Sequence, residues 1–254
     1  RTVWAMGKQL KCGDFVPFVF EHKFNMEVGD GDRKQLMSGT IDRVDICENG
    51  TDVYVRIIDY KTGKKDFNIV KTYYGIDIQL MVYMEAAMKL VAKMRPGKNV
   101  IPAGVFYYNI SDPIVSATTE SAEEIEDKIK GELRLKGMVN SDKDIAEKMD
   151  NTEGTSLNIP VSRKADGGFD SRRSKVMNTE QFNMLGRFVD VRAVDTADRI
   201  AGGDIRRSPY KDGQFSSCDR CPYGAVCGFS VDLPGCNYRK LKKFDDEVLW
   251  NNIK

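Results

Sequence analysis

The stretch GTIDRVDICENGTDVYVRIIDYKTG, residues 39–63, decides the fold of this chain. Two alternating apolar runs flank Asn49-Gly50, which is the strongest short-range signal for a two-residue β-hairpin turn. With these two residues as the turn, Asp42 is expected opposite Ile57, and Asp59 opposite Thr40. Asp42 and Asp59 then share the apolar face of the hairpin. The two carboxylates are then diagonal neighbours, with Cα atoms roughly 7–8 Å apart.

This placement of acids on an apolar face predicts a metal site. Burying two unpaired carboxylates is costly unless a metal, a cation or a shared proton accompanies them. Oxygen ligands suit Mg²⁺ or Mn²⁺ better than zinc, and Lys61, two residues beyond Asp59, could orient water or stabilise a charged transition state. An amphipathic hairpin with a Lys–Asp ion pair at its solvated end explains the same pattern. A one-residue slip in register would separate Asp42 from Asp59.

The composition sets the limits within which a function can be sought. The chain has 254 residues and a formal net charge of +1, so a polyanion site has to come from local clusters such as Lys64, Lys65 and Lys71. No apolar stretch approaches the length of about 20 residues that a membrane span needs, and no signal peptide opens the chain, so no membrane association is expected. The six cysteines are too sparse for a disulfide scaffold, which favours a reducing compartment, the bacterial cytoplasm.

The remaining sequence alternates strand and helix patterns. Strands are predicted at residues 15–24 and 103–110, and helices at 72–94, from a capping box of Ser121 and Glu124, and from about 179 to 201. Residues 140–175 are expected to form loops around a short hairpin. We divide the chain into a core, 1–203, which includes the 140–175 insertion, and an irregular C-terminal tail, 204–254, that carries most of the cysteines and packs on the core.

Two further patterns lie near the hairpin. Gln79 and Tyr83 share a helix face directly after it and are expected to shape the site. A Gln beside a core Tyr is also a common packing arrangement. His22, the sole histidine, shares a strand face with Phe18 and Phe24 and is interpreted as a packed residue rather than a catalytic one.

The cysteine spacing Cys218-x2-Cys221-x5-Cys227 predicts a metal or cluster site. Zinc would usually require a second cysteine pair or two histidines, so an iron–sulfur cluster is favoured. Candidates for a fourth ligand include Cys12 and Cys236. Three unliganded thiols remain the alternative.

Taken in order, these motifs resemble the RecB-like branch of the PD-(D/E)XK nucleases, and within it the C-terminal nuclease domains of the AddB type. The resemblance is carried by Gly39-Thr-Ile-Asp-Arg-Val-Asp45, Ile58-Asp-Tyr-Lys-Thr-Gly63, Gly75-x3-Gln79-Leu-x2-Tyr83, Ala103-Gly-Val-Phe-Tyr-Tyr108, Cys218-x2-Cys-Pro-Tyr-x3-Cys227 and Asn237-Tyr-Arg239. It implies an α/β fold, a restriction-endonuclease-like mixed sheet flanked by helices. The family's metal ligands map onto Asp42 and Asp59, with the Tyr60 carbonyl as an additional ligand.

The same resemblance implies the other site residues and the function. The family's lysine maps onto Lys61 and its Gln/Tyr motif onto Gln79 and Tyr83. The implied activity is Mg²⁺- or Mn²⁺-dependent exonuclease cleavage of DNA within a bacterial AddAB-type ATP-dependent helicase–nuclease, with an AddA-like subunit as partner, in double-strand-break processing and recombinational repair.

The chain departs from the family pattern at its start. The family's upstream histidine and first cluster cysteine are not visible, so we expect an N-terminally truncated domain whose 4Fe–4S cluster is absent or incomplete. A non-catalytic DNA-end-binding module and a stand-alone CRISPR-associated-type exonuclease remain alternatives. The three costly groups Asp42, Asp59 and Lys61 favour an enzyme.

Overall fold

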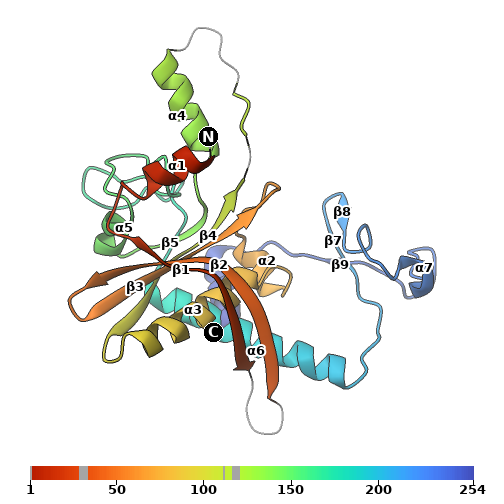
Figure 1. Cartoon of the computed structure of the whole chain (residues 1–254). Helices are drawn as coiled ribbons and strands as arrows, with labels where there is room; N and C mark the ends of the chain where they lie inside the picture. Colours follow the sequence, from red (N-terminus) through yellow and green to blue (C-terminus); the bar gives the residue numbers. More distant parts are fainter. Residues whose placement is uncertain (1, 29–33, 111, 116–120) are drawn as a thin grey trace.

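A six-stranded mixed sheet forms the centre of the molecule, and its strands follow chain order from β1 to β6 (Figure 1). The computed structural model describes residues 2–28, 34–110, 112–115 and 121–254. The strands are β1 (Val16–Val28), β2 (Gln35–Asn49), β3 (Asp52–Lys61), β4 (Asn99–Asn109), β5 (Lys136–Asn140) and β6 (Val176–Met177). β3 pairs with β4, and β5 with β6, in parallel, while the other neighbours are antiparallel.

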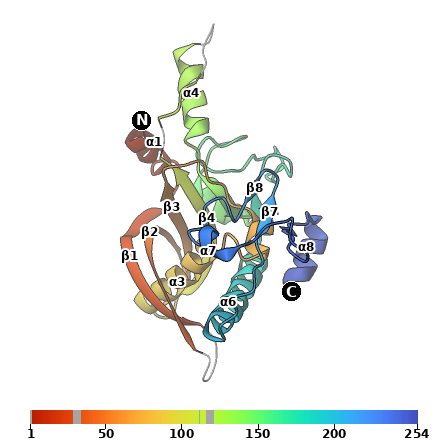
Figure 2. The same ribbon diagram turned by 90° about the vertical axis from the view of Figure 1, so that its right-hand side faces the viewer.

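Helices flank both faces of this sheet (Figure 2). The helices of the described segments are α1 (Thr2–Gln9), α2 (Ile69–Tyr73), α3 (Gln79–Met94), α4 (Ala122–Glu132), α5 (Lys143–Met149), α6 (Thr179–Ala201), α7 (Gly224–Cys227) and α8 (Asp246–Ile253). α3, α6 and α8 bury apolar side chains in the core on one face, and α5 does so on the other. The predicted fold class is therefore confirmed. No helix in the described segments is both long and apolar enough to cross a bilayer.

β3 is buried on both faces because it lies inside the sheet. Val53, Val55 and Ile57 belong to the core beneath α3, whereas Tyr54 and Ile58 belong to the core on the opposite face. Strands covered on both faces read as nearly continuous apolar runs rather than as clean alternation. A charged residue in this strand is thus surrounded by core on at least one side.

The predicted helix over 72–94 is wrong at its start, because the chain breaks into α2 and α3. Gly75 has a φ of +73°, a left-handed conformation that glycine adopts without strain and that ends the first helix. The turn is fixed from within, since Thr72 Oγ1 donates to the Asp77 carbonyl at 2.9 Å. The apolar spacing that predicted one helix continues across this break.

The polar segment 140–175 contains α5, which was not predicted. Asp142 caps this helix by accepting from the N–H groups of Asp144 and Ile145. Beyond it, the buried Asp150 carboxylate accepts hydrogen bonds from Ser156 and from other groups of the loop. The expected hairpin is reduced to isolated bridges.

The predicted capping box of Ser121 and Glu124 is confirmed at the start of α4. α4 projects away from the sheet in both views (Figures 1 and 2), and none of its residues is buried. Its apolar residues therefore do not contribute to the core.

The C-terminal segment forms a small sheet of β7 (Tyr210–Asp212), β8 (Phe215–Ser216) and β9 (Arg239–Lys240) before it returns to the core through α8. The residue after α2 anchors this segment, because Tyr74 Oη accepts from the Lys242 N–H at 2.9 Å and its ring packs against Phe244. Leu249 and Ile253 of α8 are buried in the main core. The division at residue 203 remains a prediction.

Candidate active site

The β2–β3 hairpin brings the two predicted metal ligands together, in a register that differs from the prediction. Asn49 pairs with Asp52, so Gly50-Thr51 forms the turn, with Gly50 at a φ of +59°. The register is shifted by two residues, which leaves every side chain on its predicted face. Arg43–Ile58 is the last registered pair away from the turn. Asp42 and Asp59 both lie one residue beyond it, and so they lie across from one another rather than diagonally.

The Asp59 carboxylate is buried, with 2% of the residue exposed. Its Oδ2 lies 2.5 Å from Lys61 Nζ. Apart from this ion pair, Oδ2 is a buried oxygen without a hydrogen-bond donor in the described part of the chain. Burial raises the pKa of the Asp59 carboxyl; the ammonium of Lys61 opposes this shift, and the negative charge of Asp42 adds to it. The two acids therefore interact, as the metal-site prediction requires.

Asp42 is held by the backbone of the neighbouring strand. Its Oδ2 accepts from the Tyr60 N–H at 2.7 Å, which fixes the carboxylate beside Asp59. The Tyr60 ring lies on the other face, against Tyr108 at a centroid distance of 6.0 Å. A role for the Tyr60 carbonyl as metal ligand stays a prediction.

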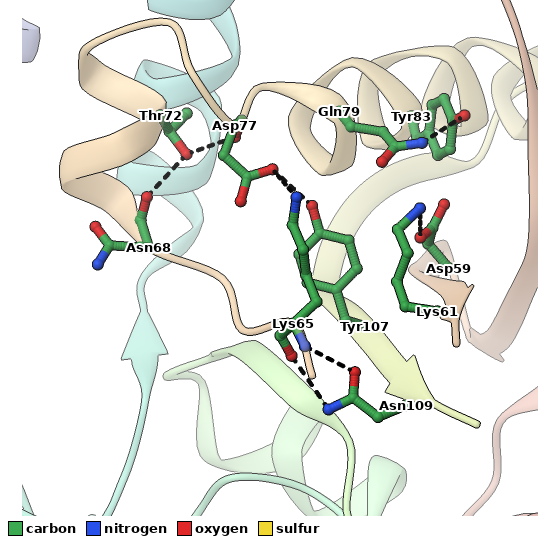
Figure 3. Close-up of polar contacts among 10 residues, drawn as sticks. All are labelled: Asp59, Lys61, Lys65, Asn68, Thr72, Asp77, Gln79, Tyr83, Tyr107 and Asn109. Carbon is green, nitrogen blue, oxygen red and sulfur yellow. Dashed lines mark hydrogen bonds and ion pairs between the residues drawn. The ribbon is translucent and has the colours of Figure 1, made fainter. Parts of the chain in front are cut away.

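Gln79 and Tyr83 form a hydrogen-bonded pair at the start of α3, with 2.9 Å between Gln79 Nε2 and Tyr83 Oη. In Figure 3 this pair and the Asp59–Lys61 pair face the same space. Gly39 of β2 allows this approach, because a Cβ at that position would lie 2.9 Å from Phe24 Cε1 and 3.3 Å from Tyr83 Cε1. The glycine of the first motif thus makes room for the aromatic residue of the third.

A second network beside the site was missed by the sequence analysis. The buried Asp77 accepts from Tyr107 Oη at 2.8 Å and forms an ion pair with Lys65 at 3.2 Å (Figure 3). Tyr107 lies next to Asp59 because the two residues pair across the parallel strands β3 and β4. Burial raises the pKa of the Tyr107 hydroxyl well above its ordinary range, and the charges of Asp77 and Asp59 add to the shift. The sequence carries no local signal for this network, because the network depends on the parallel pairing of β3 with β4.

The opposite face of the hairpin carries a buried cluster of charges. Asp45 is fully buried, and its carboxylate accepts from Arg43 at 2.6 and 2.7 Å and from Arg56 at 2.9 Å. Burial lowers the pKa of Arg56. Burial acts in the same direction on Arg43, but the hydrogen bonds and the charge of Asp45 outweigh burial, so the pKa of Arg43 is raised. Arg56 is the registered partner of Asp45, so the cluster joins β2 to β3 close to the metal ligands.

The site residues fit a hard divalent cation. Two carboxylates offer oxygen ligands on one side, and the buried Oδ2 of Asp59 has the Lys61 ammonium as its one partner among the described residues. Mg²⁺ commonly uses one or two protein carboxylates and fills its other positions with water and substrate oxygens. Within residues 2–28, 34–110, 112–115 and 121–254, no group of three or more His, Cys, Asp or Glu is arranged to hold a metal. A site of two carboxylates is consistent with that finding.

Of the three predicted cluster cysteines, Cys218 and Cys221 precede α7 and Cys227 is its last residue, and they do not form such a group. All six cysteines are free thiols, and Cys221 is exposed. Cys12 follows α1, which lies away from α7 in both views (Figures 1 and 2). His22 lies on β1 opposite Ile41 of β2, and no described hydrogen bond or ion pair joins it to Asp42 or Asp59.

Two cavities beyond the end of β3 contain both lysines and acidic residues, among them Asp66 in each. The first, of about 460 Å³, includes Lys64, Lys65, Lys71 and Lys175, and the second, of about 300 Å³, includes Lys64, Lys65 and Lys136. Burial lowers the pKa of Lys136. Lysines therefore gather beyond the end of the hairpin, but Lys71 and Lys175 are paired with Asp212 and Asp66.

The hairpin thus presents Asp42, Asp59 and Lys61 together on inner strands of a mixed α/β sheet. The sequence profile of the PD-(D/E)XK nuclease superfamily matches residues 1–228, and the chain belongs to this superfamily.

The similar proteins share one name, which describes each of them as a subunit of an "ATP-dependent helicase/deoxyribonuclease". The relative from Clostridium botulinum (strain Hall) is 36% identical, and those from Clostridium kluyveri and Thermoanaerobacter pseudethanolicus are 34% identical, each over 265 aligned residues. The alignments cover 100% of this chain and 23% of each relative, so the chain spans less than a quarter of their length. The predicted resemblance is confirmed.

Proposed function

We propose that this chain is the nuclease domain of an ATP-dependent helicase–nuclease and hydrolyses DNA phosphodiester bonds with a divalent metal. The observation that carries the proposal is the meeting of Asp42, Asp59 and Lys61 on one hairpin in a chain of the PD-(D/E)XK superfamily. The raised pKa of Asp59 supports it, because burial makes the negative charge of this carboxylate costly and a bound cation would offset that cost.

Each residue has a distinct part in this chemistry. Asp42 and Asp59 would hold Mg²⁺ or Mn²⁺, with the Tyr60 carbonyl as a further ligand, and the metal when bound supplies Lewis acidity and an activated water. Lys61 positions the attacking water or the phosphate oxygen beside Asp59. Gln79 and Tyr83 border the same space and contact the DNA backbone.

The relatives' names support a proposal for the complex and the substrate. Those proteins are named as helicase and deoxyribonuclease subunits, and the aligned domain is 23% of their length. We propose an AddA-like partner subunit, exonuclease action on strands that the helicase delivers, and a role in double-strand-break processing and recombinational repair. Six free thiols suit the reducing bacterial cytoplasm.

We also propose that Cys218, Cys221 and Cys227 bind a 4Fe–4S cluster in the full-length protein. The spacing supports this, and the fourth ligand would come from another cysteine. The test is iron and sulfide analysis of purified full-length protein, with C221S as the comparison. Full iron content in C221S would refute the assignment.

Cleavage of linear DNA in Mg²⁺ tests the nuclease assignment. Asp59→Ala should abolish cleavage and leave the fold intact, because it removes a carboxylate that is costly without metal. Asp52→Ala is the matched control, since Asp52 lies at the far end of the same strand and its side chain bonds only to Asn99 among the described residues. It should retain activity.

A readout independent of turnover accompanies this assay. Mg²⁺ that binds the folded state should raise the thermal midpoint of the wild type and of Asp52→Ala, but not of Asp59→Ala. Full nuclease activity in Asp59→Ala contradicts the assignment. DNA binding without any Mg²⁺-dependent cleavage by the wild type would instead identify a binding module.

A further inference from the structure

Lys65 is fixed to the end of the sheet by its own backbone. Its N–H donates to Asn109 Oδ1 at 3.0 Å, and Asn109 Nδ2 donates to the Lys65 carbonyl at 3.3 Å. Asn109 is the last residue of β4 and pairs with Lys61 across the parallel strands. The chain that leaves β3 is therefore clamped to β4 four residues after the active-site lysine.

The side chain of Lys65 is fixed as well. Its Nζ lies 3.2 Å from Asp77 Oδ1, and the same oxygen accepts the Tyr107 hydroxyl at 2.8 Å. Asp77 is 7% exposed and Tyr107 is fully buried, so both partners are immobile. Lys65 Nζ also lies 5.1 Å from the centroid of the Tyr107 ring, within the range of a cation–π contact. An ordinary surface lysine has none of these restraints.

Lys65 lies beside the active site but does not belong to the metal-binding group. Lys61 Nζ is 5.7 Å from the centroid of the same Tyr107 ring, so the two ammonium groups flank one aromatic side chain (Figure 3). Lys61 forms its ion pair with Asp59, whereas Lys65 forms its ion pair with Asp77. The two lysines thus serve different carboxylates.

The Lys65 ammonium still has room for a ligand. Its side chain is 40% exposed and lines both cavities. An ammonium has three N–H donors, and Asp77 requires one of them. Asp66 and Asp77 line the same cavity, and Lys71 and Lys175 form ion pairs with Asp212 and Asp66. The charge that an incoming anion meets is therefore local, and Lys65 is a fixed ammonium with N–H donors left for one compact anion.

A purely structural role for the Lys65–Asp77 pair would be to hold the turn between α2 and α3. That turn is already fixed without the lysine, because Asp77 bonds to Tyr107 through its carboxylate and to Thr72 through its carbonyl. The Lys65 ammonium balances the charge of the buried Asp77 carboxylate, but the turn does not need its other N–H donors.

We propose that Lys65, held by Asp77, Tyr107 and Asn109, binds one specific backbone phosphate of the DNA strand next to the phosphate that is cleaved. This assignment rests on the proposed function, since it takes the ligand to be a DNA strand. Lys65 contacts the substrate, and Asp77 acts through Lys65 as a positioning residue.

The test measures binding, so that it does not depend on turnover. This chain is titrated with a fluorescent single-stranded oligonucleotide in Ca²⁺ in place of Mg²⁺, with a gel to show that the DNA stays intact. In a series of oligonucleotides, one neutral methylphosphonate linkage is moved along the strand. The variants are Lys65→Ala, Asp77→Asn and the matched control Lys64→Ala, which removes the same charge one residue away at an exposed position.

The wild type should lose affinity when the neutral linkage occupies one particular position. Lys65→Ala should bind the natural strand about tenfold more weakly. Its plot of log affinity against log salt concentration should be shallower by about 0.7, and its affinity should no longer depend on whether the linkage at that position is neutral. Lys64→Ala should keep the wild-type response. Asp77→Asn should weaken binding although it removes a negative charge, whereas a general field effect predicts tighter binding.

Two results would overturn the inference. One is a Lys65→Ala variant that responds to the neutral linkage as the wild type does. The other is tighter DNA binding by Asp77→Asn with an unchanged thermal midpoint. If Asp77→Asn does not fold, Tyr107→Phe, which removes only the hydroxyl that Asp77 accepts, takes its place in this test. If the position-specific response is found but Mg²⁺ supports no cleavage, the nuclease assignment fails and the phosphate site stands.

Discussion

Asp45→Asn should destabilise the protein strongly although the two side chains have nearly the same size. Asp45 is fully buried and shares its carboxylate between Arg43 and Arg56, which are each 3% exposed. The asparagine keeps one acceptor oxygen but turns an NH₂ group, a donor, toward one of the two guanidinium groups. Arg43 and Arg56 keep their charges, and they then share one acceptor oxygen in place of a carboxylate with two.

The expected loss is about 3–5 kcal/mol, the usual cost of breaking a buried ion pair by removing one member. For a chain of this length each kcal/mol corresponds to about 2–4 °C in the thermal midpoint, so the midpoint should fall by roughly 6–20 °C. Asp52→Asn, at the far end of β3, is the control and should change stability by no more than about 0.5 kcal/mol.

Urea and thermal unfolding monitored by circular dichroism provide the measurement. A loss below about 1 kcal/mol would refute the reasoning, since it would mean that the arginines remain solvated. A triple variant, R43M with D45L and R56M, separates charge from packing. It should recover most of the lost stability, because apolar residues of similar size commonly replace a buried ion cluster at no cost.

Two other expectations concern the insertion and the contact between motifs. Burial acts to raise the pKa of the Asp150 carboxyl, but the hydrogen bonds to the carboxylate outweigh burial, and the pKa is lowered. The ionised Asp150 therefore stabilises the fold above its unfolded pKa of about 3.9, and this stabilisation is lost as the pH falls. The stability difference between wild type and Asp150→Asn, from urea titrations, should be constant above about pH 5 and shrink below about pH 4, and a pH-independent difference would contradict this. Gly39→Ala should cost about 1–3 kcal/mol by overpacking against Phe24 and Tyr83, and should reduce DNA cleavage more than Tyr83→Phe does; unchanged stability in unfolding experiments would show that the rings move aside freely.

The hairpin could be predicted because its signals are local. Asn49-Gly50 and the alternating runs on each side specify two antiparallel strands whatever the rest of the chain does. The predicted turn was wrong by one residue because Gly50, not Asn49, takes the first turn position with positive φ. The resulting shift of two residues left the acids on the same face, so their meeting does not depend on the exact turn, and their role stays a prediction.

The Asp77 network could not be predicted for the opposite reason. Lys65, Asp77 and Tyr107 come from three segments, and their meeting depends on the parallel pairing of β3 with β4 and on the break at Gly75. Apolar periodicity continues through that break, so the helix pattern concealed the turn that carries Asp77. Cysteine spacing has a related weakness, since it reports which ligands are available and not whether the fold gathers them.

The hairpin origin of the metal ligands has a consequence for the order in which the molecule assembles. Asp42, Asp59 and Lys61 belong to strands joined by a two-residue turn, so little loop-closure entropy opposes their meeting. Tyr107 reaches Asp59 only after the chain has crossed over through α2 and α3 to lay β4 parallel to β3. Contacts of longer sequence separation carry a larger loop-closure cost, so we expect this crossover to form later than the hairpin. On this expectation the carboxylates meet first, and the aromatic and lysine side chains that complete their surroundings arrive with the second half of the sheet.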